Sequence, residues 1–440
     1  MKSVATAACA AVAVIGISVP LAAQVGNPAS PRVGTPAAPE LAGPPAPVQA
    51  VIPAPRSGPL PSTLTLVQSL DEAAARSPAV VAAQAEVAAA EARVRQSGYR
   101  SNPELSLEVE NVAGTGELRG VRSMETTLAV NQRLDLGGRR SARVDSARAA
   151  LTVQQIRLAI ARADLGQSVR EQFARAVSAR EKLTQATETV ARARELQRVT
   201  VILVEAGRDP PLRALRANTA LAQAEAEREA AEAEELAARS SLAASFGVSI
   251  PVDSVSGATL DLTPRFIVPG SSLDVRLADA ERLAAQASVR EQLAERRLDP
   301  AVGVGVRHVR ATGDVGLVAG ISMPLRMFDR NQGNIDAARS ALAAADARRA
   351  ATLATTIARG RNAIAIVEAA QRRVTALEQA AVPEATEALR LVELSYREGR
   401  STLLEVLDVQ NAYTASRSAL TEARLALALA TAELGRIAAQ

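Results

Sequence analysis

The sequence predicts a mainly α-helical protein with a small β part, in which one helix–β-hairpin–long-helix unit occurs twice. Three observations carry this prediction. The composition favours long helices, short alternating apolar and polar segments interrupt the helical pattern in each half, and an X-Pro pair precedes each interruption. Each half therefore reads as a helix, a β-hairpin, a long helix, a turn and another long helix.

The composition explains the helical bias. Of 440 residues, 48% are hydrophobic, 22% are charged and only 2% are aromatic. Alanine, leucine, glutamate, arginine and glutamine dominate, and such a mixture favours helices that pack closely through small side chains. The formal net charge is +4, but the basic residues are spread along the helices among acidic ones. We exclude nucleic-acid binding, because a clustered basic face and an aromatic stacking surface are both missing.

The first 23 residues read as a secretory signal peptide. Lys2 forms a short positive region, Ala7–Val19 is apolar, and Leu21–Ala23 offers small residues before a cleavage point. The apolar run is shorter than the ~20 residues that span a bilayer. Cys9 is the only cysteine and precedes most of the apolar run, which disfavours lipid attachment and leaves the mature chain without disulfides.

The rest of the chain divides into four segments. Residues 24–62 hold about half of the 22 prolines and have no apolar periodicity, so we expect a disordered linker. Residues 63–248 form the first repeat, residues 249–271 an inter-repeat loop, and residues 272–440 the second repeat.

In the first repeat, a helix is expected from about Leu70 to Ser97, and Asn102–Pro103 stops it. Two strands follow, Glu104–Glu110 and Met124–Val130, separated by a loop with three glycines. After Gly137–Gly138, a helical run of about 65 residues begins near Arg139 and extends roughly 100 Å at about 1.5 Å per residue. Its packing face is marked by apolar residues at helical spacing, namely Leu165, Val169, Phe173 and Val177.

The second repeat follows the same order. A helix is expected from about Leu273 to Arg297, and Asp299–Pro300 stops it. Valines alternate with glycines over Val302–Val306, and Val315–Met323 alternates again after a turn at Gly313–Asp314. The final helices begin near Ile335. Four strands cannot close a membrane barrel, which needs about eight, so other subunits must complete the sheet.

The chain resembles the TolC superfamily of outer-membrane efflux proteins over nearly everything after the linker. The resemblance is carried by several segments that match in order. Two strand-to-helix junctions, LDLGGRRSARVDSA and MPLRMFDRNQGNIDAA, resemble the CzcC-like branch of heavy-metal efflux systems. The other matching segments are LTLVQSLDEAAARSPAVVAAQAEVAAAEARVRQSGYRSNPELSLEVE and YREGRSTLLEVLDVQNAYTASRSAL.

The resemblance implies a TolC-like homotrimer in the bacterial outer membrane. Twelve strands would form one barrel in outer-membrane lipid, and twelve helices would form a periplasmic tunnel. A periplasmic adaptor and an inner-membrane transporter would open the far end of this tunnel. The expected function is passive export, with heavy-metal cations as the expected substrate. The alternatives are a periplasmic coiled-coil scaffold or adaptor, and an outer-membrane factor for drug or protein export.

The final helix-to-helix turn holds the main candidate site. Glu405 and Asp408 are three residues apart and share one helical face. The resemblance implies that acidic residues at this turn narrow the pore, although a solvated acidic helix N-terminus is the plainer interpretation. Aligning the two halves places Arg213 and Arg216 opposite these carboxylates, which suggests charge pairs that hold the pore closed.

The same two turns are candidates for docking an adaptor. Each carries a Gly-Arg pair, and the residues are Gly207, Arg208, Gly399 and Arg400. No catalytic residue, cofactor site or metal site is expected. His308 is the only histidine and has no ligand partner at a suitable spacing. Enzyme motifs are also missing from the sequence, so we expect no catalysis.

Overall fold

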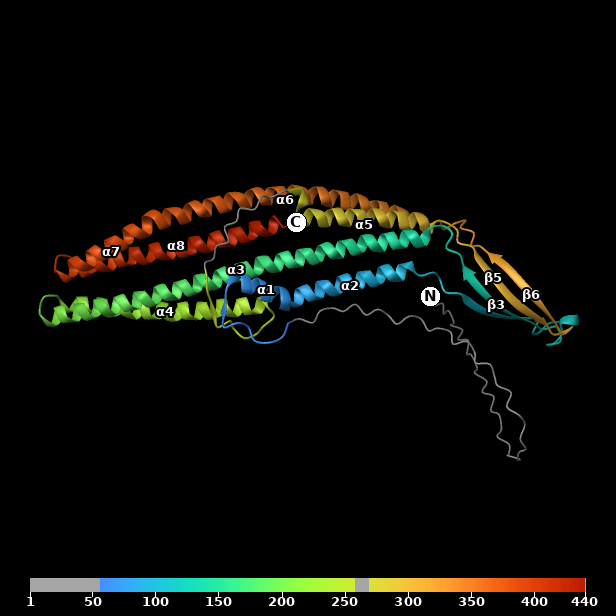
Figure 1. Ribbon diagram of the computed structural model, residues 1–440, viewed down its shortest axis with the longest axis horizontal. Helices are drawn as coiled ribbons and strands as arrows, with labels where there is room; N and C mark the ends of the chain where they lie inside the picture. Colours follow the sequence, from blue (N-terminus) through green and yellow to red (C-terminus); the bar gives the residue numbers. More distant parts are fainter. Residues whose placement is uncertain (1–55, 258–268, 440) are drawn as a thin grey trace, which may run out of the picture. The chain divides into compact units, whose positions relative to one another are not determined.

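The computed structural model describes residues 56–257 and 269–439 (Figure 1). The predicted signal peptide, most of the Pro-rich segment and part of the inter-repeat loop lie outside the described residues. The duplicated order of a helix, a β-hairpin and two long helices is confirmed. The helices of the first repeat are α1 (Leu66–Arg76), α2 (Pro78–Gly98), α3 (Arg139–Glu205) and α4 (Pro211–Ser245). Those of the second repeat are α5 (Leu273–Glu295), α6 (Gln332–Ala376), α7 (Val382–Arg397) and α8 (Leu403–Ile437).

The first helix differs from its prediction. A single helix from Leu70 to Ser97 was wrong, because the chain breaks at Ser77 between α1 and α2. Ser77 has φ −58° and ψ 118°, as expected for a residue before proline. Pro78 then occupies the first turn of α2, where its missing N–H costs no helical hydrogen bond.

A proline also disturbs the long helix of the second repeat. A π-helical turn, Leu377–Ala381, separates α6 from α7, and Pro383 lies in the first turn of α7. Proline cannot donate to the carbonyl four residues earlier, and a π turn is one way to absorb that loss without ending the helix. The counterpart in the first repeat, α3, runs without interruption for 67 residues.

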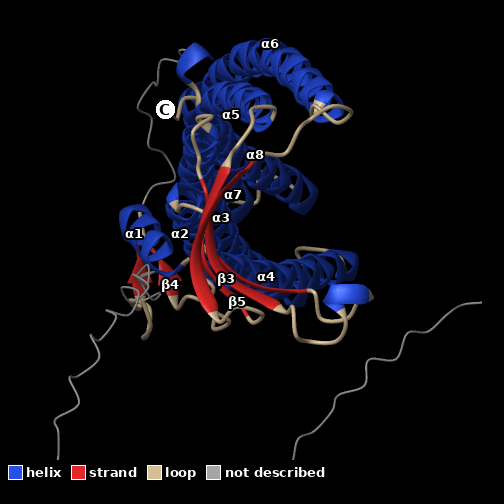
Figure 2. Ribbon diagram, turned by 90° about the vertical axis from the view of Figure 1, so that its right-hand side faces the viewer, coloured by secondary structure: helices blue, strands red, loops and turns tan. Residues whose placement is uncertain are grey.

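The two hairpins join into one antiparallel sheet. The strand order is β2-β3-β5-β6, so β2 and β6 form the edges. β3 pairs with β5 across the repeats, and the two strands lie side by side in the sheet (Figure 2). The strands are β2 (Glu104–Glu110), β3 (Glu125–Arg133), β5 (Ala301–Val309) and β6 (Asp314–Ser322). β3 is longer than predicted because its pairing with β5 continues to Arg133, opposite Ala301.

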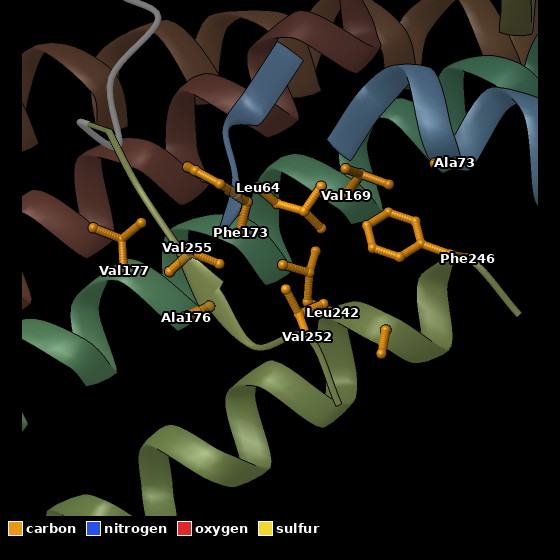
Figure 3. Packing of buried hydrophobic residues seen from close by; sticks show 11 residues of the cluster. Leu64, Ala73, Val169, Phe173, Ala176, Val177, Leu242, Phe246, Val252 and Val255 are labelled. Carbon is orange, nitrogen blue, oxygen red and sulfur yellow. The ribbon is translucent and has the colours of Figure 1, made fainter. Parts of the chain in front are cut away.

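A second, two-stranded sheet was not foreseen. β1 (Thr63–Leu64) pairs in parallel with β4 (Ser254–Val255), which brings the start of the first repeat beside the beginning of the inter-repeat loop. Leu64 and Val255 point into a buried cluster with Phe173 of α3 and with Leu242 and Phe246 at the end of α4 (Figure 3). Strands of two residues have no readable alternation, which explains why the sequence did not reveal them.

The described end of the Pro-rich segment lies along α1. The backbone N–H of Arg56 donates to the Ala75 carbonyl at 3.0 Å. The buried Arg76 side chain donates to the Gly58 carbonyl at 2.7 Å and to Glu72 at 2.6 Å. Residues 56–62 are therefore held against the first helix, while residues 24–55 of this segment lie outside the described residues.

α3 connects the two repeats. It contacts α2 and α4 of its own repeat and α5 and α8 of the second. Arg436 of α8 illustrates the connection, since its guanidinium pairs with Asp164 of α3 and with Asp274 of α5. Among the described helices, none is both long and apolar enough to cross a membrane.

Replacing Phe173 with alanine tests the cluster that joins α1, α3, α4 and the small sheet. Phe173 is 1% exposed, and removing a buried aromatic ring leaves a cavity. We expect the free energy of unfolding to fall by about 3–5 kcal/mol in guanidinium titrations followed by circular dichroism. Val67→Ala, at a position on α1 that is 68% exposed, is the control and should change it by less than about 0.5 kcal/mol. Equal losses in both variants would contradict the assignment of this core.

Candidate functional site

The two turns between long helices have the same backbone geometry. α3 and α4 are joined at Gly207, with φ +69°, and α7 and α8 at Gly399, with φ +74°. In each turn the following arginine N–H reaches back into the helix, Arg208 to Leu203 at 2.9 Å and Arg400 to Ser395 at 2.8 Å. Only glycine adopts this left-handed conformation without steric cost, so the two glycines serve as matched helix caps. We call these turns, residues 206–210 and 398–402, the two tips.

The two tips lie beside each other. A Cβ atom built on Gly399 would stand 3.4 Å from the guanidinium of Arg208. Arg208 and Arg400 are both exposed, and Arg400 pairs with the nearby Glu398 at 3.3 Å. The structure therefore brings the four residues predicted to dock an adaptor into one region, and their role in docking stays a prediction.

The Glu405 carboxylate caps the start of its own helix, α8. The Thr402 N–H donates to Glu405 Oε2 at 2.7 Å, and the Glu405 N–H donates to the Thr402 hydroxyl at 3.4 Å. This reciprocal arrangement is a capping box, which fixes the first turn of α8. Asp408 lies one turn further on, and both carboxylates are exposed in the single chain.

Arg213 has a different partner from the one predicted. It pairs with Asp209, four residues earlier, across the first turn of α4. Within the described part of a single chain, neither Arg213 nor Arg216 forms an ion pair with Glu405 or Asp408. Pairing between these charges stays a prediction for the assembled protein.

A contact between Asp209 and Tyr396 links the two tips. Neither residue was identified from the sequence as part of the site. The Tyr396 hydroxyl lies 3.1 Å from the Thr200 hydroxyl of α3 and donates to Asp209 Oδ2 at 3.5 Å. Arg213 holds the other oxygen of the same carboxylate. The available signal was position alone: Tyr396 is one of only three tyrosines and stands three residues before Gly399.

Tyr396 is also part of the apolar packing near the tips. Its ring is 4% exposed and packs in a cluster with Leu403 and Val406. Burial raises the pKa of the Tyr396 phenol above its ordinary value of 10.0, and the nearby charge of Asp209 adds to this, while the Thr200 hydrogen bond opposes it. The neutral phenol is therefore the form that the folded chain stabilises.

The four-stranded sheet has one apolar face that is open to the surroundings. Leu107, Leu128, Val306 and Leu317 are consecutive cross-strand partners in a row over all four strands. They are 66%, 49%, 46% and 89% exposed. A continuous row of exposed branched side chains is costly in water, so this face is built for an apolar environment or partner.

The opposite face of the sheet is polar. Arg307 of β5 pairs with Glu125 of β3 at 2.9 Å and with Glu110 of β2 at 3.1 Å, and it donates to the Thr127 hydroxyl at 3.0 Å. One guanidinium thus joins three strands on this face. Because strand side chains alternate between faces, the ion pairs of Arg307 lie on the face opposite the row of Leu107, Leu128, Val306 and Leu317.

The described residues hold no cluster of three or more histidine, cysteine, aspartate or glutamate side chains that could bind a metal ion. His308 is exposed and stands opposite Thr126 and Val315 in the sheet. It therefore lies among residues that offer no metal-binding group.

Two β-hairpins in one sheet with an exposed apolar face, each leading into a long helical hairpin with a matched tip, are the architecture of an outer-membrane efflux protein. The chain belongs to the outer membrane efflux protein family, which it matches over residues 69–248 and 269–440. This family assignment bears out the predicted resemblance to TolC-type proteins and the predicted class of function.

Metal-resistance proteins are among the relatives. The nickel-cobalt-cadmium resistance protein NccC of Alcaligenes xylosoxydans xylosoxydans is 30% identical over 294 residues, which span 66% of this chain and 66% of NccC, just under two thirds of its length. The cobalt-zinc-cadmium resistance protein CzcC of Cupriavidus metallidurans is 28% identical over 79% of this chain and 83% of CzcC.

Solved channel structures share the fold. The outer membrane protein VceC of Vibrio cholerae superposes with a TM-score of 0.72 at 21% identity, over 85% of this chain and 96% of VceC. The MtrE outer membrane channel of Neisseria gonorrhoeae gives 0.69 at 20% identity, over 88% and 94%. At this level of identity the likeness establishes the fold, which is the mainly helical architecture predicted from the sequence.

Replacing Tyr396 with phenylalanine tests the link between the tips. In an alkaline titration at 295 nm, the native chain should show one phenol ionising above the ordinary range, and Tyr396→Phe should lack it. A raised native pKa means that the folded state holds the proton better than the unfolded one. Its stabilisation is complete below the unfolded pKa of about 10 and is lost as pH rises through the native pKa. A titration curve of unchanged shape, with only its amplitude reduced, would contradict this environment for Tyr396.

Proposed function

We propose that this protein is the outer-membrane channel subunit of a tripartite efflux system that exports heavy-metal cations from the periplasm. Three copies would place their four-stranded sheets edge to edge in a twelve-stranded barrel within outer-membrane lipid. Their long helices would form a periplasmic tunnel of twelve helices. Residues 1–23 would direct export of the chain across the inner membrane.

The observation that carries the proposal is the combination of unpaired edges and segregated faces in the sheet. β2 and β6 are its edge strands, and a strand edge presents backbone N–H and C=O groups that need partners in a membrane. Closure with further copies satisfies these groups and turns the apolar face to lipid. The charged face with Arg307 then lines the lumen.

Heavy-metal cations are the proposed substrate for two reasons. The relatives NccC and CzcC are named as metal-resistance proteins. Glu405 and Asp408 are exposed on one face beside the tip, and three copies would present six carboxylates to a narrow passage, which would favour cations. Specific coordination is not part of the proposal, since conduction requires weak binding.

The tips are the proposed docking sites for a periplasmic adaptor, which in turn would connect the channel to an inner-membrane transporter. Gly207, Arg208, Gly399 and Arg400 form paired, exposed turns at the ends of both helical hairpins. A coiled-coil adaptor is the weaker alternative for the protein itself, because the four-stranded sheet with its apolar face would then have no role.

A deletion strain provides the test of function. Loss of the gene should lower the tolerated concentration of nickel, cobalt, cadmium or zinc ions, and the expressed chain should appear as a trimer in the outer-membrane fraction. Normal metal tolerance together with increased sensitivity to drugs would reject the substrate. A monomer in the soluble periplasmic fraction would reject the channel.

Charge reversal at Arg213 and Arg216 tests the closed tip. Arg213→Glu removes the partner of Asp209 and places a second carboxylate beside it, and Arg216→Glu adds another negative charge. We expect the double variant to raise the closed-state conductance in planar bilayers several-fold. The Arg213→Lys/Arg216→Lys variant keeps both charges and is the control. An unchanged closed-state conductance in the charge-reversed variant would contradict the proposal that Arg213 and Arg216 hold the pore closed.

The sheet faces are tested on neighbouring residues of β2. Leu107→Arg puts a charge on the apolar face, which costs roughly 2–4 kcal/mol near the bilayer centre. Glu108→Arg puts the same side chain on the polar face. We expect Leu107→Arg to reduce the amount of trimer in the outer membrane several-fold and Glu108→Arg to leave it close to normal. Equal effects of the two substitutions would contradict the assignment of faces.

A further inference from the structure

We propose that a ladder of polar contacts between α3 and α8 sets the axial register of the two repeats and so brings their two tips to the same height. The importance of level tips for a gate or an adaptor rests on the channel function proposed above. The register itself is a property of the single chain and can be measured without any transport assay.

The ladder has four rungs along the middle of the two helices. An ion pair joins Glu181 to Arg424 at 3.1 Å, and a hydrogen bond joins Gln185 to Thr421 at 2.8 Å. Glu188 pairs with Arg417, and the guanidinium of Arg192 lies 5.1 Å from the centre of the Tyr413 ring. The rungs ascend α3 in steps of four, three and four residues while they descend α8 in steps of three, four and four, so they line one face of each antiparallel helix.

No short turn connects α3 to α8, so the chain connection does not set the register of these two helices. Short turns set the register within each hairpin, but Glu188 and Arg417 are 229 residues apart in the chain, and Glu181 and Arg424 are 243 apart. Ala423 and Ala428 are among the buried residues of α8 in this section and Ala179 is buried on α3, while the larger buried Leu427 clusters with Val374 of α6. Apolar packing between α3 and α8 therefore gives little discrimination between registers here. Small, similar side chains fit almost as well after a slip of one heptad, about 10 Å at about 1.5 Å per residue.

The polar rungs distinguish the observed register from registers shifted by one heptad. After a one-heptad slip in one direction Glu188 would face Arg424, and after a slip in the other Glu181 would face Arg417. Either slip keeps a single ion pair. After the first slip Glu181 would face Thr431, and after the second Glu188 would face Gln410, so each slip replaces one of the two ion pairs with a contact to a neutral side chain. Fixing a register is the best-attested use of polar pairs in packed helices.

The same register is the one that makes the tips meet. Following α3 and α8 from the ladder towards their ends, Leu196, Val199 and Leu203 of α3 pack against Leu403 and Val406 of α8. One step further, Asp209 reaches Tyr396, and Arg208 approaches Gly399. A shifted ladder would separate all of these groups together.

Arg424 ties a third element to the ladder. Its guanidinium also donates to Glu378 at 2.6 Å and 2.9 Å, and Glu378 lies in the π-helical turn between α6 and α7. The point at which α7 leaves the long helix is thereby held at the level of the ladder. Arg417 and Arg424 are positioning residues in this sense, since they act on the tips through the register of the helices.

The test measures the distance between the tips by electron paramagnetic resonance. The chain's only cysteine is Cys9, within the predicted signal peptide, so Arg208→Cys and Arg400→Cys give two defined spin-label sites in the mature chain. Labelled chains are mixed with an excess of unlabelled chains, so that the distance within one subunit dominates. The unmodified ladder should give one narrow, short distance.

Three variants are compared on this background. Arg417→Glu with Arg424→Glu should move the distribution by about 10 Å or add a second population at that separation. Adding Glu181→Arg, Glu188→Arg and Glu378→Arg reverses the partners as well and should restore the single short distance. Arg194→Glu breaks the α3–α4 ion pair with Glu225, 2.7 Å long, and should leave the distance unchanged because a short turn sets that register.

Circular dichroism verifies that each variant is folded. A folded Arg417→Glu/Arg424→Glu variant with an unchanged tip distance overturns the proposal. A shift that the reversed partners fail to correct overturns it as well, and so does an equal shift in Arg194→Glu. If the reversal variant does not fold, recovery of both folding and the short distance on reversing the partners supports the ladder, and failure to recover them counts against it. A correct register in a protein that conducts no ions would reject the channel function and leave the ladder intact.

Discussion

The contact of α3 with α8 is the interaction on which the helical part of the protein depends. α3 is one unbroken helix of 67 residues and packs against helices of both repeats, so it serves as the common reference for their positions. Along the ladder, Ala179 of α3 and Ala423 and Ala428 of α8 are buried, whereas larger side chains such as Phe173 and Leu403 pack elsewhere along α3. Close packing then supplies stability, while the choice among similar registers falls to polar pairs.

The pairing of β3 with β5 plays the corresponding part in the sheet. It is the place where the two hairpins become one surface, and its nine paired positions align the apolar rows of both hairpins. A slip of one residue would turn every side chain to the opposite face. Arg307 favours the observed register over this slip, because its ion pairs with Glu110 and Glu125 form only when all three side chains share the polar face.

Asp209 shows how one carboxylate can connect local and long-range structure. It pairs with Arg213 within its own helix start and accepts a hydrogen bond from Tyr396 of the other repeat. Sequence symmetry between the two turns pointed to Arg213 and Arg216 and suggested Glu405 and Asp408 as their partners, which stays a prediction for the assembled protein. In the single chain Glu405 caps its own helix, since a partner three residues away is met more readily than one on another helix.

The amino-acid sequence by itself determined the elements that rest on local physics. Period-2 segments gave β2 with the predicted ends, the Gly-Gly pair marked the start of α3, and the repeated order established the duplication. The two prolines inside predicted helices had different effects, a break at Ser77 before Pro78 and a π turn before Pro383, and the sequence did not distinguish these outcomes. Only the tertiary structure decided the strand pair β1–β4, the Tyr396–Asp209 contact and the rungs between α3 and α8. Each of these joins residues far apart in the chain, where no periodicity or spacing records the partner.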